Sequence, residues 1–363
     1  MRRNPRSYRM SGAALAAAVL SVTAAACSSG ASTSSQPAQG GSAASSATTV
    51  RIELTPVPQC LLQYVAQEEG FFAANGIKAQ DVSIATTATA MAGLASNSVD
   101  IINGPPEVVL PAIAKGLKIQ ALSVDTTAPW TIMANDTVKK VPGSLPAKLT
   151  ALKGLTFGVS ALGSGTYYVT RAVMNTVGLS YPQDYSIAAV GSSQTALPAI
   201  ETNHVQLIIN GQPTVDQLIA AHAGYVVANV GAPGTAVPPN RNVLWATASW
   251  VSAHPALAGD VARAMAQAYV WFQDSAHFAT AENLMQKLIG TGSIPSGYLA
   301  SMTKAQIAAS QPWLSASDLQ QSDEFDLKSK LIPSLVPAAS LLAPGVPASQ
   351  SAATSLASSK SGS

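Results

Sequence analysis

Cysteine and histidine are scarce in this chain of 363 residues, which holds two cysteines and four histidines. Two cysteines are too few for a cysteine-rich iron or zinc motif. The histidines are scattered, and none has a second histidine or a carboxylate at the spacing of metal ligands. We therefore expect neither a metal site nor a cofactor.

Charged residues are also few, at 10% of the chain, and the formal net charge of +2 is misleading. Four arginines, at positions 2, 3, 6 and 9, stand in the first ten residues, where there is no acid. The remainder carries 16 basic against 18 acidic residues. A nearly neutral body without a basic cluster lacks the electrostatic footprint of a nucleic-acid-binding protein, so we expect no nucleic-acid partner.

The chain also lacks the Gly-x-Ser-x-Gly turn that carries the nucleophile of many serine hydrolases. The nearest match, Gly158 to Leu162, ends in leucine where that turn needs glycine. Together with the absence of a metal motif, this predicts a protein that is not an enzyme.

What the chain does contain is a duplicated unit. The stretch Gln80 to Gly104 returns in altered form at Gln183 to Gly211. Each copy opens on a β-branched run, passes through a Thr/Ser-rich turn into an alanine-rich helical segment, and ends on an apolar strand closed by Asn-Gly. Apolar strands separated by helices are typical of parallel sheets buried on both faces. Two unrelated βαβ units would give a similar pattern. Duplication favours an α/β protein of two lobes, each a mainly parallel sheet flanked by helices.

The N-terminus has the plan of a secretory signal peptide: arginines, an apolar stretch from Ala13 to Val22, and small residues before Cys27. A cysteine at this junction, followed by a Ser/Gly/Ala-rich tether, resembles a bacterial lipoprotein signal, although Ala24 stands where such signals usually carry leucine. The alternatives are cleavage near Ala26 without lipidation, or an uncleaved anchor. We expect lipidation of Cys27 and anchoring to the outer face of the cell membrane. The other cysteine, Cys60, is interpreted as a small, partly buried apolar residue.

Three stretches resemble a known family in the right order. They are the run YVAQEEGFFAANGI (Tyr64 to Ile77), the segment Leu94 to Gly104, and the segment Leu152 to Leu179. They are similar to the extracytoplasmic solute-binding proteins of the nitrate, sulfonate and taurine (SsuA/TauA-like) group. The resemblance implies a two-lobed, type II periplasmic-binding-protein-like fold with a cleft between the lobes. It also implies an ABC permease and its ATPase as partners, and we expect a monomer.

On this basis the chain divides into five parts. We predict a signal peptide at 1–26, a disordered tether at 27–49 and a disordered tail at 337–363. Lobe one takes 50–128 plus 248–336, and lobe two takes 129–247. The expected function is capture of a small polar or anionic solute (sulfonate, nitrate, zwitterion or heterocycle) by hinge closure, and its delivery to a permease. The alternatives are an enzyme on the same fold acting on a pyrimidine-like substrate, and a ligand-sensing subunit without transport.

Ligands of open α/β sheets bind at the carboxyl ends of the strands, and this rule selects the candidate site. Because no arginine falls in the selected turns, an anionic group would be held by backbone N–H groups and hydroxyls at Ser164 to Thr166. The alternative for these residues is a helix cap. Glu107 is expected to hold the donor end of the solute, unless it and Asp125 cap helices or face solvent. The predicted ligand-binding residues are Gln59, Thr86, Thr87, Asn103, Glu107, Asp125, Ser164, Gly165, Thr166, Ser192, Ser193, Asn210 and Gln212.

Overall fold

Two five-stranded sheets of the same design organise the described part of the chain. The computed structural model describes residues 47–84, 86–191, 193–231, 237–290 and 297–360. The first sheet has the order β2-β1-β3-β10-β4, with bounds Ile77–Val82, Thr48–Glu53, Ile101–Gly104, Asn240–Thr247 and Ile119–Ala128. The second has the order β7-β6-β8-β5-β9, with bounds Ser186–Ala189, Thr156–Val159, Leu207–Asn210, Trp130–Ala134 and Tyr225–Val230. We call the first sheet with its helices lobe one, and the second lobe two.

The sequence duplication corresponds to this repeated design. In each sheet three strands run parallel, β2-β1-β3 and β7-β6-β8, and the inserted strand, β10 or β5, is antiparallel to both of its neighbours. The two copies of the repeat lie in different sheets, which confirms the predicted two-lobed α/β architecture. The apolar pairs Ile101-Ile102 and Ile208-Ile209 are almost fully buried, as expected for strands covered by helices on both faces.

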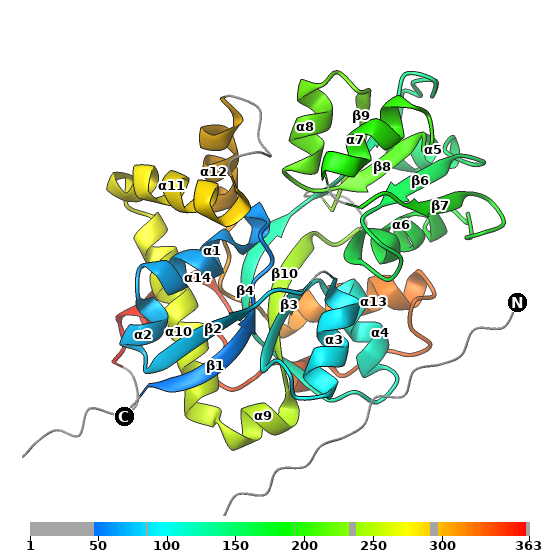
Figure 1. Cartoon of the computed structure of the whole chain (residues 1–363). Helices are drawn as coiled ribbons and strands as arrows, with labels where there is room; N and C mark the ends of the chain where they lie inside the picture. Colours follow the sequence, from blue (N-terminus) through cyan, green and yellow to red (C-terminus); the bar gives the residue numbers. More distant parts are fainter. Residues whose placement is uncertain (1–46, 85, 192, 232–236, 291–296, 361–363) are drawn as a thin grey trace, which may run out of the picture. The chain divides into compact units, whose positions relative to one another are not determined.

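Helices follow the strands in both lobes (Figure 1). Those of lobe one are η1 (Pro58–Cys60), α1 (Leu61–Glu68), α2 (Phe71–Ala74), α3 (Thr87–Ala95) and α4 (Pro106–Ile113). Those of lobe two are α5 (Leu145–Thr150), α6 (Gly165–Asn175), α7 (Ser193–Glu201) and α8 (Thr214–Ala220). Helices α1 and α2 are separated at Gly70, which adopts a left-handed conformation (φ 77°) that favours glycine.

The chain passes from one sheet to the other at two places. Pro129 separates β4 from β5, and the second passage lies between β9 and β10. The predicted boundary of lobe two at residue 247 is wrong, because β10 pairs with β4 of lobe one along its whole length and with β3 along part of it. Trp245, which is fully buried, donates a hydrogen bond from its indole nitrogen to the Gly104 carbonyl (2.9 Å) and so ties β10 to the end of β3.

The C-terminal helices pack mainly on lobe one. They are α9 (Ala248–Ala253), α10 (Pro255–Phe272), η2 (Ser275–His277), α11 (Phe278–Ile289), α12 (Tyr298–Ala309) and α13 (Ala316–Lys328). Helix α10 packs against α1 in the main core of lobe one. Helix α13 packs against α4 of lobe one, while its Phe325 belongs to the core of lobe two. Helix α13 therefore contacts both lobes.

The prediction of a disordered tail from residue 337 differs from the structure. Ala338–Leu341 forms η3, and Gln350–Ser358 forms α14, which lies alongside α10 (Figure 1). The fully buried Ala353 and a hydrogen bond from the Gln350 side chain to the Tyr269 hydroxyl (2.7 Å) hold α14 in place. Residues 1–26, and Cys27 with most of the expected tether, lie outside the described residues, although Thr48 and Thr49 already belong to β1. Within the described ranges no helix is long and apolar enough to cross a membrane.

Candidate functional site

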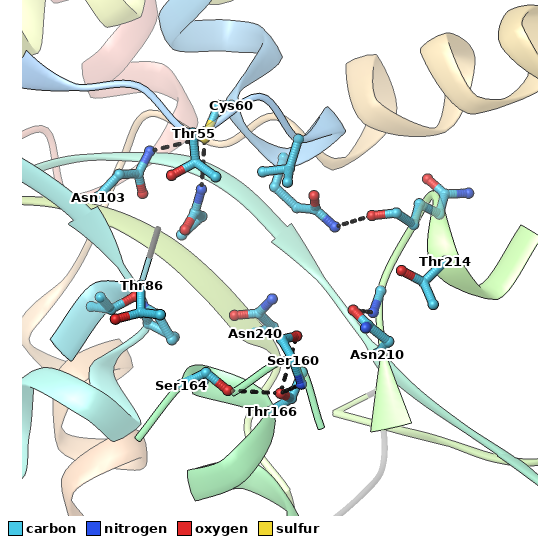
Figure 2. A pocket seen from close by; sticks show the side chains of 18 of the residues that line it. Thr55, Cys60, Thr86, Asn103, Ser160, Ser164, Thr166, Asn210, Thr214 and Asn240 are labelled. Atoms are coloured by element: carbon cyan, nitrogen blue, oxygen red, sulfur yellow. Dashed lines mark hydrogen bonds between the residues drawn. The ribbon is translucent and has the colours of Figure 1, made fainter. Parts of the chain in front are cut away.

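A cavity of about 560 Å³ lies where the carboxyl ends of the two sheets meet (Figure 2). Lobe one contributes the end of β1, the start of η1, the first turn of α3 and the end of β3. Lobe two contributes the β6–α6 turn, Gly191 and the segment after β8. Trp130 at the start of β5 and two asparagines of β10, Asn240 and Asn242, complete the wall. This is the location that the strand-end rule predicts.

The structure brings most of the predicted site residues together at this cavity. Nine of them line it: Gln59, Thr86, Thr87, Asn103, Ser164, Gly165, Thr166, Asn210 and Gln212. Of the remaining four, Ser192 lies outside the described residues, and Ser193 is placed only as the first residue of α7. That these residues bind a ligand stays a prediction.

The expectation that Glu107 faces the cleft is not met. Glu107 lies in the first turn of α4, is 1% exposed and is absent from the cavity wall. Burial raises its pKa to about 7, which the nearby guanidinium of Arg241 opposes. Helix α13 packs on α4 here and carries Asp326. Burial first, and then the negative charge of Glu107, raise the pKa of Asp326. Glu107 therefore belongs to a buried acidic cluster behind the cavity.

Asp125 is also displaced from the expected position, for a different reason. It is fully buried on β4, and its Oδ1 accepts hydrogen bonds from the backbone N–H groups of Leu62 (3.1 Å) and Gln63 (3.3 Å) at the start of α1. Its Oδ2 accepts one from Asn103 Nδ2 (3.3 Å). Asp125 thus caps α1, as the alternative interpretation held, and orients a residue of the cavity wall.

Glu53, which the sequence analysis missed, is the carboxyl group of the cavity wall. It is the last residue of β1 and 2% exposed. Burial raises its pKa to about 7, although hydrogen bonds from the Asn103 backbone N–H (3.0 Å) and the Thr55 hydroxyl (3.2 Å) oppose the rise. Its position at the end of the first strand was the available signal, but the strand-end rule selects residues that follow a strand.

The β6–α6 turn forms a helix cap, as the alternative interpretation of Ser164 held. The Ser164 hydroxyl donates to the Ala161 carbonyl (2.7 Å) and accepts from the Tyr167 N–H (3.4 Å). The Thr166 hydroxyl accepts from the Ser160 N–H (2.9 Å) and lies 2.8 Å from the Ser164 hydroxyl. Both hydroxyls therefore stabilise the turn itself.

Uncharged amides and hydroxyls supply most of the other polar groups of the wall, which is otherwise apolar. Beyond the predicted residues it includes Thr55, Cys60, Ser160, Thr214, Asn240 and Asn242, together with Trp130. Cys60 is 1% exposed and accepts hydrogen bonds from the side-chain amides of Asn103 (3.6 Å) and Asn242 (3.5 Å). Burial and the nearby Asp125 and Glu53 carboxyls raise the pKa of this thiol, so it stays protonated, in keeping with a structural residue.

Carboxamides connect the two lobes at one side of the cavity. The side chain of Gln59 in lobe one donates to the backbone carbonyl of Gln212 in lobe two (3.1 Å). The side chain of Gln306 on α12 donates to the side-chain oxygen of the same Gln212 (2.9 Å). The described residues contain no group of three or more His, Cys, Asp or Glu arranged to hold a metal ion.

Comparisons with known proteins extend these observations. Residues 43–287 match the sequence profile of the NMT1-like family. No curated protein matches the chain in sequence. The alkanesulfonate-binding protein SsuA from Xanthomonas axonopodis pv. citri, bound to MOPS, has a similar structure (TM-score 0.62, 16% identity, covering 81% of this chain and 97% of SsuA).

Two further structures are similar. One is the periplasmic nitrate-binding protein NrtA from Synechocystis PCC 6803 (TM-score 0.63, 14% identity, covering 80% of this chain and 84% of NrtA). The other is a mutant of DszB in complex with biphenyl-2-sulfinic acid (TM-score 0.57, 16% identity, covering 82% of this chain and 96% of DszB). At these identities the likeness establishes the fold, which is that of periplasmic binding proteins.

Proposed function

This chain belongs to the NMT1-like family, and from that premise we propose that it is the extracytoplasmic solute-binding component of an ABC importer. Among the similar structures, SsuA is named for binding alkanesulfonate and NrtA for binding nitrate. The observation that carries the proposal is a cavity walled by both lobes, which are joined by two passages of the chain. A small polar solute enters between the lobes, and rotation about these passages buries it from both sides for delivery to a permease.

An enzyme on this fold is the second candidate. The residue that favours this alternative is Glu53, whose pKa of about 7 suits a general acid or base. Cys60 does not supply an activated nucleophile, since its pKa is raised. The two candidates differ in the fate of the solute, which a binding protein releases unchanged.

A thermal-shift screen of the mature protein tests this function. The panel covers sulfonates, carboxylates, nitrate, amides, amidines, purines, pyrimidines and amino acids. We expect at least one class to raise the melting temperature, because a ligand at about 100 times its Kd adds roughly 2.7 kcal/mol of stability. Calorimetry of the hit should give one site per chain, and mass spectrometry should recover it unchanged. Turnover of the hit, or no hit in any class, would overturn the proposal.

We propose further that Cys27 carries a lipid that anchors the protein to the outer face of the cell membrane. The support is the sequence around it: an arginine-rich start, an apolar stretch and small residues up to Ala26. A single acyl chain binds a membrane only reversibly, so stable anchoring needs more than one chain.

The Cys27→Ser variant tests the anchor. Expressed in a bacterium with a lipoprotein pathway, the wild type should incorporate labelled palmitate and sediment with membranes. The variant should incorporate none and appear in the soluble extracytoplasmic fraction. Cys60→Ser is the matched control and should keep both the label and the membrane location. An unlabelled wild type, or a variant that still sediments with membranes, contradicts lipidation at Cys27.

A further inference from the structure

The ionisable groups around the solute cavity are acidic. Apart from the Cys60 thiol, Glu53 supplies the only ionisable side chain among the described residues of the wall. A second chamber of about 400 Å³ shares Gln59, Gly211, Gln212 and Asn240 with the cavity and adds Asp216. Neither chamber has a lysine, arginine or histidine in its described lining. A simple anion would meet carboxyl groups here and no compensating cation.

Asn103 presents an oxygen without a donor. Its Nδ2 lies within hydrogen-bond distance of two oxygen acceptors, Gln63 Oε1 (3.1 Å) and Asp125 Oδ2 (3.3 Å), besides the Cys60 sulfur. Because only the amide nitrogen can donate to these oxygens, Oδ1 must lie on the opposite side of the group. It is buried and has no hydrogen-bond partner in the described structure. Figure 2 shows the Asn103 nitrogen directed toward Cys60 and its oxygen turned away.

Acceptors outnumber donors among the unpaired polar atoms of the two chambers. The buried amide oxygens Asn103 Oδ1, Asn240 Oδ1 and Gln306 Oε1 have no partner within the described residues. The unpaired N–H donor is Trp130 Nε1, and the unpaired Thr127 hydroxyl can donate or accept. A buried acceptor left without a donor destabilises a folded protein. A solute with several N–H groups would supply the missing donors.

The hydroxyls of the turn that would hold an anion are already engaged in hydrogen bonds within the turn. Ser164 and Thr166 use their hydroxyls to close the β6–α6 turn, and the Tyr167 N–H at the start of α6 donates to Ser164. The Glu53 carboxyl group, by contrast, can accept further hydrogen bonds. Each of its oxygens accepts one hydrogen bond, from Asn103 or Thr55, and retains a further lone pair.

Resting on the solute-binding function above, we propose that the cavity takes a nitrogen-bearing solute, uncharged or cationic, that donates hydrogen bonds to Glu53, Asn103 and Asn240. The site discriminates against oxyanions. Trp130, which forms part of the wall, supplies an aromatic ring against which a planar amide, amidine or heterocycle can pack. The solute class thus differs from the sulfonate and nitrate for which SsuA and NrtA are named.

The pH dependence of binding separates a donor solute from an anion. Burial raises the pKa of Glu53 to about 7, so its carboxylate form grows as the pH passes through that value. A charged carboxylate accepts stronger hydrogen bonds than a neutral acid, so affinity for a donor solute rises with pH. An anion held by the protonated acid would bind more weakly as the pH rises. Cys60 from η1 and Asp125 from β4 are the nearby titratable groups, and burial raises the pKa of both.

Calorimetry with matched probes tests the proposal on the mature chain. The pairs are benzamidine with benzoate and nicotinamide with nicotinate, which share a ring and differ in the donor; ethanesulfonate and nitrate complete the set. We expect each donor probe to bind at least about tenfold more tightly than its matched acid. Affinity for the donor probes should increase severalfold from pH 6 to pH 8.

Two variants assign the effect to named atoms. Glu53→Gln should abolish the pH dependence and weaken the donor probes about tenfold. Asn240→Leu removes an unpaired oxygen and should weaken binding of the donor probes without lowering the melting temperature. This second variant keeps the proposal testable if the Glu53 variant does not fold. Glu69→Gln, on an exposed acid of the same lobe, is the control and should change nothing.

The outcomes distinguish the two proposals. Oxyanions that bind as tightly as the donor probes, with affinity falling as the pH rises, would overturn the solute class and leave the binding function standing. A donor probe unaffected by both cavity variants would also overturn it. If no probe binds and the wider thermal-shift panel gives no hit, the solute-binding function itself fails.

Discussion

Replacing Asp326 by asparagine is expected to raise the free energy of unfolding at pH 8 by about 2 kcal/mol, the order of cost of an unpaired buried polar group. Asp326 on α13 is fully buried, and neither of its oxygens has a hydrogen-bond partner in the described structure. Burial, then the charges of Glu107 and Asp323, raise its pKa above the usual range. Asparagine keeps the shape of the side chain and removes the ionisable carboxyl group.

The gain should depend on pH with a definite sign. In the unfolded chain Asp326 ionises near pH 4, whereas the folded protein retains the proton until its raised pKa is reached. The unfolded state therefore binds fewer protons over this range, and native stability falls as the pH rises. The variant lacks this loss, so its advantage should vanish near pH 4 and grow toward pH 8.

Urea unfolding at pH 4, 6 and 8 measures the effect. Glu69→Gln is the control, since Glu69 is an exposed acid at the end of another helix, α1, and it should leave the pH profile of the wild type unchanged. Equal pH slopes for the wild type and Asp326→Asn would show that Asp326 is not held protonated.

Replacing Gly165 by leucine should weaken solute binding about 100-fold or more while the protein stays folded. A Cβ atom at Gly165 in lobe two would lie 3.0 Å from Pro105 Cγ in lobe one and 3.4 Å from Trp130 Cη2. A longer side chain cannot enter this gap and would hold the lobes apart. If the closed form falls to about 1% of molecules, apparent affinity falls about 100-fold.

Calorimetry with the strongest screening hit, together with a melting curve, tests this expectation. Gly259→Leu is the control: Gly259 lies in α10, a Cβ there would meet nothing within 4 Å, and binding should be unchanged. Unaltered affinity in Gly165→Leu would mean that the two lobes do not have to approach at this point.

The sequence predicts the parts of this fold that local pattern determines. Apolar runs such as Ile208-Ile209, closed by Asn-Gly, indicate buried strands, and the repeat indicates two sheets. The sequence pattern does not predict which strands pair when they are far apart in the chain. Strand β10 joins the sheet of lobe one by contacts with strands more than a hundred residues earlier, which no local pattern encodes.

Errors at the site have the same origin. Glu107 follows a strand as the rule requires, but α13, about two hundred residues later, covers it. The strand-end rule does not select Glu53, because Glu53 is the last residue of a strand and does not follow one. The tail is predicted to be disordered, yet small residues such as Ala353 let α14 pack closely on α10.

The central claim is that two lobes close on a solute and capture it between them. Small-angle X-ray scattering tests this claim most directly. The mature protein is measured with and without a saturating concentration of the strongest screening hit, and Gly165→Leu is measured beside it. The account predicts a smaller radius of gyration for the wild type on binding and no change for the variant. A wild type that binds the solute at one site per chain with an unchanged radius of gyration would contradict it.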